Sequence, residues 1–408
     1  MKPHDVKEGA LRGQRVLAAG AAAAAVVLTV SLALAADSPD ATAAATGRHA
    51  AGPAVPRYYM ALPGADDFAN VPGAPTAVLA STFTGKTLLT VRPSGKDKFV
   101  TVSAAADDRT FVLGAAPGLQ PPAVPSATTW YLVRVRPGRG PAPAAIVRKL
   151  SVPGPPPGGR ADTTAVSPDG RELAVLGTQP VSARSDAEFL RVYSVATGRL
   201  LHAWSGPLDV AWDAYTTLSW TDGGRGLAIG YTWFAGGGQY LGVRTLDVTR
   251  PGHDLVADSR LGWSIKTFLN VPKTYPLTCA VDIQVTVTAV GTVVCGAAGV
   301  FRAVKQTFGG PACPAIPAWN SAGFLEYPAA AGGGPARAVY RADSRCFPGG
   351  TGVLWASASG RVVIGYIQYG EPPFTTTSAL RFGIFAGGRF TPLPAPPTTT
   401  TVPAAIAW

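Results

Sequence analysis

A short apolar hairpin recurs five times along the 408-residue chain. In each copy an apolar run reaches a turn of small polar residues or glycine, and a second apolar run follows. The copies occupy residues 104–113, 166–175, 219–229, 287–295 and 355–364. Repeats spaced by tens of residues are typical of units that cannot bury their own apolar face and that stack on further copies. The recurrence therefore predicts an all-β fold built of stacked strand pairs.

Glycine and proline are frequent and lie between the apolar runs. The chain holds 48 Gly and 38 Pro, and 47% of its residues are hydrophobic. Gly and Pro end short strands in turns, while this apolar fraction suffices for a sizeable core. No amphipathic helical pattern of useful length interrupts the strand-like runs. The richness in Ala, Gly, Pro and Arg is typical of a high-GC bacterial proteome, such as that of an actinomycete.

Two neighbouring segments carry the most specific pattern. Residues 167–175 read Ser-Pro-Asp-Gly-Arg-Glu-Leu-Ala-Val, and residues 191–200 read Arg-Val-Tyr-Ser-Val-Ala-Thr-Gly-Arg-Leu. Asp169 and Gly170 supply a tight turn, because Gly tolerates a positive φ there. Together the segments resemble the inner and outer hairpins of WD-repeat-like β-propeller blades. The resemblance covers residues 57–395 and belongs to the broader, degenerate class, since no copy ends in a Trp-Asp pair.

The resemblance implies a single β-propeller of about six blades. Seven blades are the alternative if residues 231–284 contain a further one. Closure of a propeller normally joins the first and last strands in one blade, which removes exposed edges. We therefore expect the propeller to span residues 56–395, with residues 396–408 forming either a tail or, through residues 404–408, a closing strand.

The amino-terminal part has a different composition from the rest. Residues 1–15 are rich in Lys and Arg, and residues 16–36 follow without a charge. At about 1.5 Å per residue the uncharged stretch makes a helix of roughly 30 Å, which spans a bilayer core. We expect a cytoplasmic amino terminus, one transmembrane signal anchor, a flexible tether at residues 37–55 and an extracellular propeller on the cell membrane. Residues 33–35 (Ala-Leu-Ala) also fit a cleavage site, so secretion is the alternative.

All four cysteines lie in one third of the chain. An even, clustered set in an exported domain predicts two disulfides. Sequence order favours Cys279 with Cys295 and Cys313 with Cys346, although three pairings are possible. A zinc site is the competing interpretation, but the chain has no Cys-x-x-Cys pair and His253 is the nearest histidine. We therefore expect no metal.

The common catalytic motifs are missing. The chain has no Gly-x-Ser-x-Gly elbow, His-Glu-x-x-His pair, phosphate-binding loop or dinucleotide-binding glycine fingerprint. His202 alternates with apolar neighbours and is expected to be structural, while His253 beside Asp254 is a possible acid/base pair. The remaining candidate carboxylates, whose convergence the sequence does not show, are Asp66, Asp67, Asp107, Asp108 and Asp213. We expect no cofactor and no enzyme activity.

Aromatic residues gather in one stretch of the chain, between Trp204 and Trp263. One interpretation is that they fill the space between blades. The other is that Trp233 and Phe234, with Tyr240 nearby, lie on a flexible glycine-rich loop and bind a ligand. The second interpretation makes these three residues the candidate binding site.

The net charge of +11 permits an anionic partner, but no run of five or six like charges supports nucleic acid. The sequence thus predicts an extracytoplasmic, membrane-tethered propeller that binds, senses or scaffolds a protein or a cell-envelope ligand. The alternative is a propeller hydrolase or lyase that acts on envelope glycan or peptide. That activity requires two convergent carboxylates, or His253 with a carboxylate, at one pocket.

Overall fold

The computed structural model describes most of the propeller region. The described residues are 55–63, 74–117, 128–136, 144–182, 185–207, 214–235, 238–268, 285–287, 292–297, 323–328, 337–341, 348–357, 360–369, 379–396 and 405–408. Contacts divide the chain into two units, Met1–Ala50 and Ala51–Trp408, and every described residue belongs to the second.

The strands form six antiparallel sheets of four strands each, here called sheets A to F. Sheet A contains β24 (Ile406–Ala407), β1 (Tyr58–Ala61), β2 (Ala77–Ser81) and β3 (Thr87–Val91). Sheet B contains β4 (Asp97–Ala104), β5 (Thr110–Pro117), β6 (Thr129–Val135) and β7 (Ala145–Lys149). Sheet C contains β8 (Arg160–Val166), β9 (Glu172–Ser182), β10 (Ser185–Ser194) and β11 (Leu200–Pro207).

Sheet D contains β12 (Ala214–Thr221), β13 (Gly226–Ala235), β14 (Gly238–Asp247) and β15 (Arg260–Phe268), with a 3-10 turn η1 (Asp222–Gly224) between its first two strands. Sheet E contains β16 (Val285–Val287), β17 (Thr292–Ala297), β18 (Gly323–Pro328) and β19 (Arg337–Arg341). Sheet F contains β20 (Pro348–Ala356), β21 (Val362–Tyr369), β22 (Ala379–Ala386) and β23 (Arg389–Pro392).

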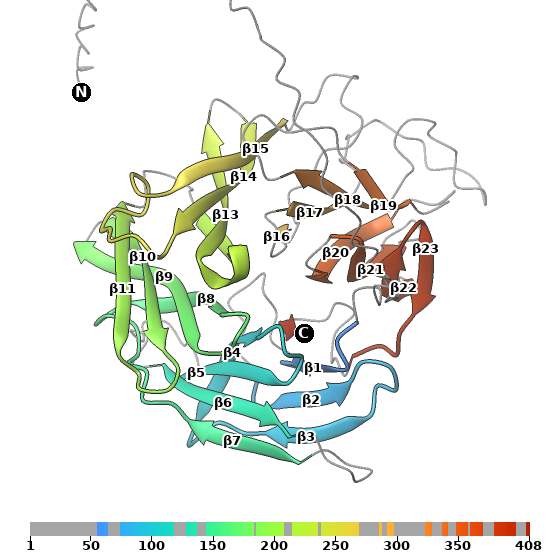
Figure 1. Cartoon of the computed structure of the whole chain (residues 1–408), viewed down its shortest axis with the longest axis horizontal. Coiled ribbons are helices and arrows are strands. Elements are labelled where there is room, and N and C mark those ends of the chain that lie inside the picture. Colours follow the sequence, from blue (N-terminus) through green and yellow to red (C-terminus); the bar gives the residue numbers. More distant parts are fainter. Residues whose placement is uncertain are drawn as a thin grey trace, which may run out of the picture. The chain divides into compact units, whose positions relative to one another are not determined.

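The sheets stand around a common axis, with one strand of each sheet innermost (Figure 1). The innermost strands contact one another in the order β4, β8, β12, β16, β20 and β24, and β24 returns to β4. The ring is therefore closed, and the fold is an all-β β-propeller as the sequence predicts. Sheets B to F each consist of four consecutive strands, whereas sheet A joins the two ends of the described chain.

The five repeated hairpins are the inner strand pairs of sheets B to F, which confirms the prediction made from their recurrence. Each inner strand therefore begins a four-stranded meander. A seventh blade within residues 231–284 is not found in the part of that interval that the structure describes. There the chain continues sheet D in two long paired strands, β14 and β15.

The turn of the second hairpin shows why its sequence is polar. The Ser167 hydroxyl donates to the Asp169 carboxylate at 2.6 Å and accepts from the backbone N–H of Glu172 at 2.9 Å. Gly170 has φ 72, in the left-handed region that glycine adopts without strain. The turn of the first hairpin uses Asp107 instead, which accepts from the backbone N–H of Thr110 at 2.8 Å. Different residues thus close equivalent turns.

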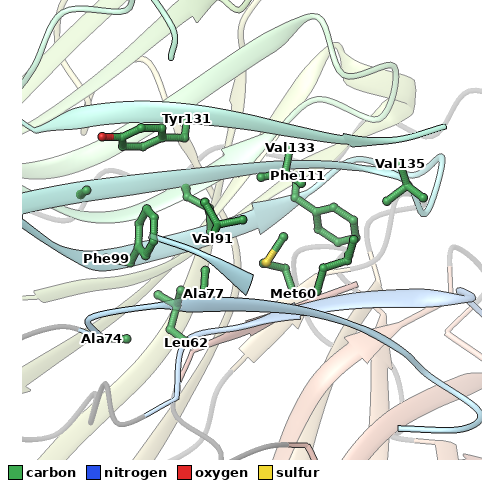
Figure 2. Packing of buried hydrophobic residues seen from close by; sticks show 13 residues of the cluster. Met60, Leu62, Ala74, Ala77, Val91, Phe99, Phe111, Tyr131, Val133 and Val135 are labelled. Carbon is green, nitrogen blue, oxygen red and sulfur yellow. The ribbon is translucent and has the colours of Figure 1, made fainter. Parts of the chain in front are cut away.

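The hydrophobic core lies between adjacent sheets. Between sheets A and B, Met60 and Phe111 are fully buried and point toward one another (Figure 2). Phe99 and Tyr131 meet edge to face, with ring centroids 5.7 Å apart. Burying each such side chain stabilises the fold by about 1.5–3 kcal/mol. The alternation of small and large apolar residues in the hairpins is therefore needed for sheet-on-sheet packing.

The last residues of the chain supply the inner strand of sheet A. Ile406 and Ala407 pair with β1, and the backbone N–H of Leu62 donates to the carbonyl of Ala405 at 2.9 Å. Trp408 is only 5% exposed and follows this strand directly. Of the two arrangements expected for residues 404–408, the structure thus has the closing strand.

Several predictions concern residues outside the described part of the chain. The expected anchor at residues 16–36 lies there, as do Cys279, Cys313 and Cys346, while Cys295 lies in β17 without a described side chain. The two disulfides therefore stay a prediction. None of the helical segments in the described part has the length and apolar character needed to cross a bilayer.

Candidate functional site

The connections between strands lie at two edges of each sheet. At one edge, called here the inner-turn edge, the first strand turns into the second and the third turns into the fourth. At the other, called the opposite edge, the second strand turns into the third and the chain passes to the next sheet. Neighbouring inner turns touch, since the backbone N–H of Ala106 donates to the carbonyl of Pro168 at 3.2 Å.

A polar cluster lies at the opposite edge of sheet C. The Arg160 Nε lies 2.7 Å from the Asp162 Oδ1, both residues being on the innermost strand β8. Pairing between β8 and β9 is irregular between Ala161 and Thr163, so Asp162 has no partner in the register. Its carboxylate is instead hydrogen-bonded to the side chain of Thr178 on β9. The bulge therefore brings together the carboxylate of Asp162, the guanidinium of Arg160 and the hydroxyl of Thr178.

The environment of Asp162 changes its acidity. Burial raises the pKa of this carboxyl, and the positive charge of Arg160 with hydrogen bonds from Thr178 and Arg160 lowers it; the net shift is upward from 3.8. The Asp162 side chain still keeps 30% of its surface exposed. A carboxyl with a perturbed pKa that solvent reaches is a candidate for ligand contact.

A second carboxylate lies in the same row of sheet C. Thr178 pairs with Arg160 on one side and with Glu188 of β10 on the other. Glu188 is only 4% exposed, although Glu is rarely buried. The sequence analysis missed Asp162 and Glu188. A charged residue directly before the buried run Phe189-Leu190 was the available indication for Glu188, whereas Asp162 sits in an ordinary polar strand.

The three predicted site residues lie on strands. Trp233 and Phe234 belong to β13, and Tyr240 belongs to β14, so the expectation of a flexible loop at Trp233 and Phe234 is wrong. The reason is that β13 and β14 pair as far as Ala235 and Gly238. Trp233 and Tyr240 are directly paired in the register. They lie at the opposite edge of sheet D, next to sheet C.

The backbone of His253 and the carboxylate of Asp254 both take part in hydrogen bonds of their loop. The carbonyl of His253 accepts from the Ser205 backbone, and the carboxylate of Asp254 accepts from the backbone N–H of Val256 at 2.8 Å. Both residues thus fasten a loop of sheet D to β11. His202 stacks on Trp204 with ring centroids 5.6 Å apart, which agrees with a structural role.

Of the other predicted carboxylates, the structure describes Asp107 and Asp108. Asp107 closes its own turn, and Asp108 lies 3.3 Å from the Arg57 Nε. Asp66, Asp67 and Asp213 lie outside the described residues. Within the described ranges no group of three or more His, Cys, Asp or Glu residues is placed to hold a metal ion.

Comparison with solved structures finds chains of weak similarity. The chain is similar to TolB from Acinetobacter baumannii (11% identity, 86% of this chain and 66% of that chain, TM-score 0.37). It is also similar to the β-propeller domain of the Trilobed protease from Pyrococcus furiosus (9% identity, 73% and 72%, TM-score 0.35). A third similar structure is an oligogalacturonate lyase in complex with manganese (11% identity, 78% and 74%, TM-score 0.38).

These similarities are too weak to transfer an activity, and the three proteins differ in what they do. No protein-family model matches the chain. A search of curated proteins finds no match either. The class to which the chain belongs, the β-propellers, thus follows from its own closed ring of sheets.

Proposed function

We propose that the protein is an extracytoplasmic, membrane-tethered β-propeller that binds a cell-envelope ligand at the opposite edge of sheets C and D. In this proposal each of the six four-stranded sheets is one blade. The observation that carries the proposal is the Arg160–Asp162 ion pair on the innermost strand, with Asp162 still partly exposed. An ion pair that only stabilised the fold would gain little at such a position.

The chemistry of the cluster favours a polar ligand. Arg160 offers hydrogen-bond donors, Asp162 offers acceptors, and the hydroxyl of Thr178 does both. Trp233 and Tyr240, register partners at the same edge of the neighbouring sheet D, are aromatic residues, a type common at sites that bind sugars and peptides. A glycan or peptide segment of the cell envelope combines hydroxyl, amide and apolar groups and so fits this set.

Binding to purified envelope glycans and stem peptides tests the proposal. We expect Asp162→Asn and Trp233→Ala to weaken binding at least tenfold in a titration. Arg171→Gln is the matched control, because it breaks another Arg–Asp ion pair of the same sheet at the inner-turn edge. Equal binding by all three variants and the wild type would exclude this site.

The location of the protein needs its own test. We propose that residues 16–36 anchor the chain, that residues 37–55 form its tether, and that the four cysteines pair outside the cytoplasm. Fractionation of the host with protease added to intact cells reports the anchor and its orientation. Mass spectrometry without reduction reports the pairing, with Cys279–Cys295 and Cys313–Cys346 as the expected bridges. A soluble cytoplasmic protein with four free thiols would refute the location.

A hydrolase or lyase of envelope glycan or peptide is the second candidate. The observation that favours it is the raised pKa of Asp162, which is typical of a general acid, with the buried Glu188 beyond Thr178. Under this hypothesis Asp162→Asn abolishes turnover and leaves ligand binding within a fewfold of wild type. Product analysis after long incubation with envelope fragments separates the two functions.

A further inference from the structure

The outermost strand of sheet B, β7, presents apolar and basic side chains to solvent (Figure 1). Four of its five residues are exposed, and only Ala145 is half-buried. Two of the four are large and apolar, since Ile146 keeps 39% of its surface exposed and Val147 keeps 43%. The other two, Arg148 and Lys149, are basic. Cationic and apolar groups thus lie next to one another on a single outer strand.

One edge of β7 has no partner strand among the described residues, because the strand pairs with β6 alone. The residues at even-numbered positions are hydrogen-bonded to β6, as shown by the bond from the Leu150 N–H to the Trp130 carbonyl at 2.8 Å. In an antiparallel ladder the residues between them turn their N–H and C=O groups to the other side. Ala145, Val147 and Lys149 therefore direct backbone donors and acceptors outward.

Another outer strand of the same propeller shows how such an edge can be occupied. In sheet C the backbone N–H of Ser205 on β11 donates to the carbonyl of His253, and the N–H of Leu255 donates to the carbonyl of Ser205, each at 2.9 Å. Residues 253–255 thus lie along β11 as a short parallel addition. In sheet B no described segment takes this place. The edge of β7 is therefore open to a segment from another chain.

The charge of this region favours an acidic segment. Residues 110–161 contain six basic residues and no acidic one. The acidic residues that border this stretch have the partners given above: Asp107, Asp108 and Asp162. Arg148 and Lys149 form no ion pair within the described residues. The neighbouring turn of sheet C, residues 195–199, approaches Ser151 and contains a further Arg but no acid.

Protection of the edge does not by itself explain this surface. Basic side chains on an edge strand discourage pairing with other chains. Ile146 and Val147 do the reverse, because β-branched side chains favour strands and an exposed apolar edge attracts further strands. A strand that only guarded the sheet would carry polar residues at these two positions. The combination fits an edge that pairs selectively with a segment of opposite charge.

We propose that β7 binds an extended acidic segment of a partner protein, which adds to sheet B as its fifth strand. In such additions main-chain hydrogen bonds give affinity and side chains give specificity. Ile146 and Arg148 lie on one face of the sheet, and Val147 and Lys149 lie on the other. An antiparallel partner that reads acidic-acidic-apolar-apolar therefore matches all four. This interaction is separate from the ligand site proposed at Asp162.

The probe is a blocked peptide, Glu-Glu-Val-Val-Glu-Glu, which presents the required pattern in either strand direction. Fluorescence anisotropy of the labelled peptide, titrated with the full chain, measures its binding. Arg148→Gln with Lys149→Gln should weaken binding about tenfold, taking about threefold for each exposed ion pair. The control pair, Arg225→Gln with Arg260→Gln, removes two exposed charges from sheet D and should leave binding unchanged.

Two further measurements report the backbone of the strand. Bound peptide should slow amide hydrogen exchange at Ala145, Val147 and Lys149 and leave Ile146 and Arg148 unchanged, because the latter two already face β6. Val147→Pro should abolish binding, since it removes an outward N–H that the sheet does not use and Pro is tolerated at such edge positions. The Gln pair keeps the proposal testable if this variant fails to fold.

The alternatives give different results. Equal binding of a peptide with Lys in place of Glu, or of the fully N-methylated acidic peptide, refutes strand addition by an acidic segment. Protection of β7 by phosphatidylglycerol vesicles or polyphosphate, without protection by the acidic peptide, also refutes it. Asp162→Asn should bind the peptide as the wild type does. Loss of binding by that variant would place the peptide at the ligand site and overturn addition at β7.

Discussion

Replacement of the last residue tests how the ring is closed. Trp408 lies between sheets A and F, with its ring centroid 5.3 Å from that of Tyr59 and 6.0 Å from that of Phe382. Its indole Nε1 donates to the hydroxyl of Thr82 at 3.2 Å. Trp408→Ala removes these contacts and leaves the two-residue strand β24 held mainly by backbone hydrogen bonds.

The expected loss follows from burial. Truncating a buried Trp to Ala costs about 3–5 kcal/mol, including the cavity that remains. Thr82 is 1% exposed, so losing its only described side-chain partner adds about 1 kcal/mol. We therefore expect the free energy of unfolding to fall by about 4 kcal/mol, a large fraction of the 5–15 kcal/mol typical of folded domains.

Urea unfolding of the full chain, followed by far-ultraviolet circular dichroism, measures this loss. Leu200→Ala is the control, because its side chain is 45% exposed and should change stability by less than about 0.5 kcal/mol. Trp408→Phe and Thr82→Val should each cost about 1 kcal/mol. Their double variant should cost less than the sum, since both remove one hydrogen bond. If Trp408→Ala is no more harmful than Leu200→Ala, the carboxy-terminal residues do not close the ring.

Three further outcomes are expected from the turns and from the polar cluster. Gly198→Ala should destabilise by several kcal/mol more than Gly223→Ala in urea unfolding. Both glycines have positive φ, but a Cβ at Gly198 would clash with the backbone oxygen of Ser151, whereas one at Gly223 meets nothing within 4 Å. Ser167→Ala should cost about 1–2 kcal/mol at neutral pH and less in acid. Burial tends to raise the pKa of Asp169, but hydrogen bonds from Ser167 and Arg171, together with the charge of Arg171, lower this pKa overall. The stabilisation of the fold by the ionised Asp169 is therefore present above pH 3.8 and is lost as the pH falls through the folded-state pKa. Because the pKa of Asp162 is raised in the folded state, the stability of the wild type should decline as the pH rises through the range just above 3.8. Asp162→Asn should remove that decline. Identical profiles of stability against pH for the variant and the wild type would contradict the burial of this carboxyl.

The propeller was predictable because its hairpins repeat a local pattern. Ser167, Asp169 and Gly170 specify a turn through hydrogen bonds and a positive φ that depend only on neighbouring residues. Ring closure was less predictable, since the pairing of Ile406 with Ala61 depends on residues far apart in sequence. A two-residue strand carries no periodic pattern that distinguishes it from a tail.

The polar cluster was not predictable for a related reason. Asp162 and Thr178 meet only because a bulge in β8 displaces Asp162 from the register, and no residue type near it demands a bulge. The expectation for Trp233 and Phe234 failed differently. The glycines after them indicate a loop by propensity, but β13 and β14 pair as far as Ala235 and Gly238. Tertiary pairing thus outweighed local propensity.

The topology of the propeller explains why its two edges carry different chemistry. At the inner-turn edge a short turn joins the first strand to the second in sheets B, C, D and F, and Arg precedes the second strand in each of these, whereas the sequence has Gly291 at that position of sheet E. Arg57 joins that series only because β24 supplies an inner strand to sheet A. At the opposite edge, the bulge at Asp162 and the Trp233–Tyr240 pair each occur in one sheet. A single irregular site suits one ligand.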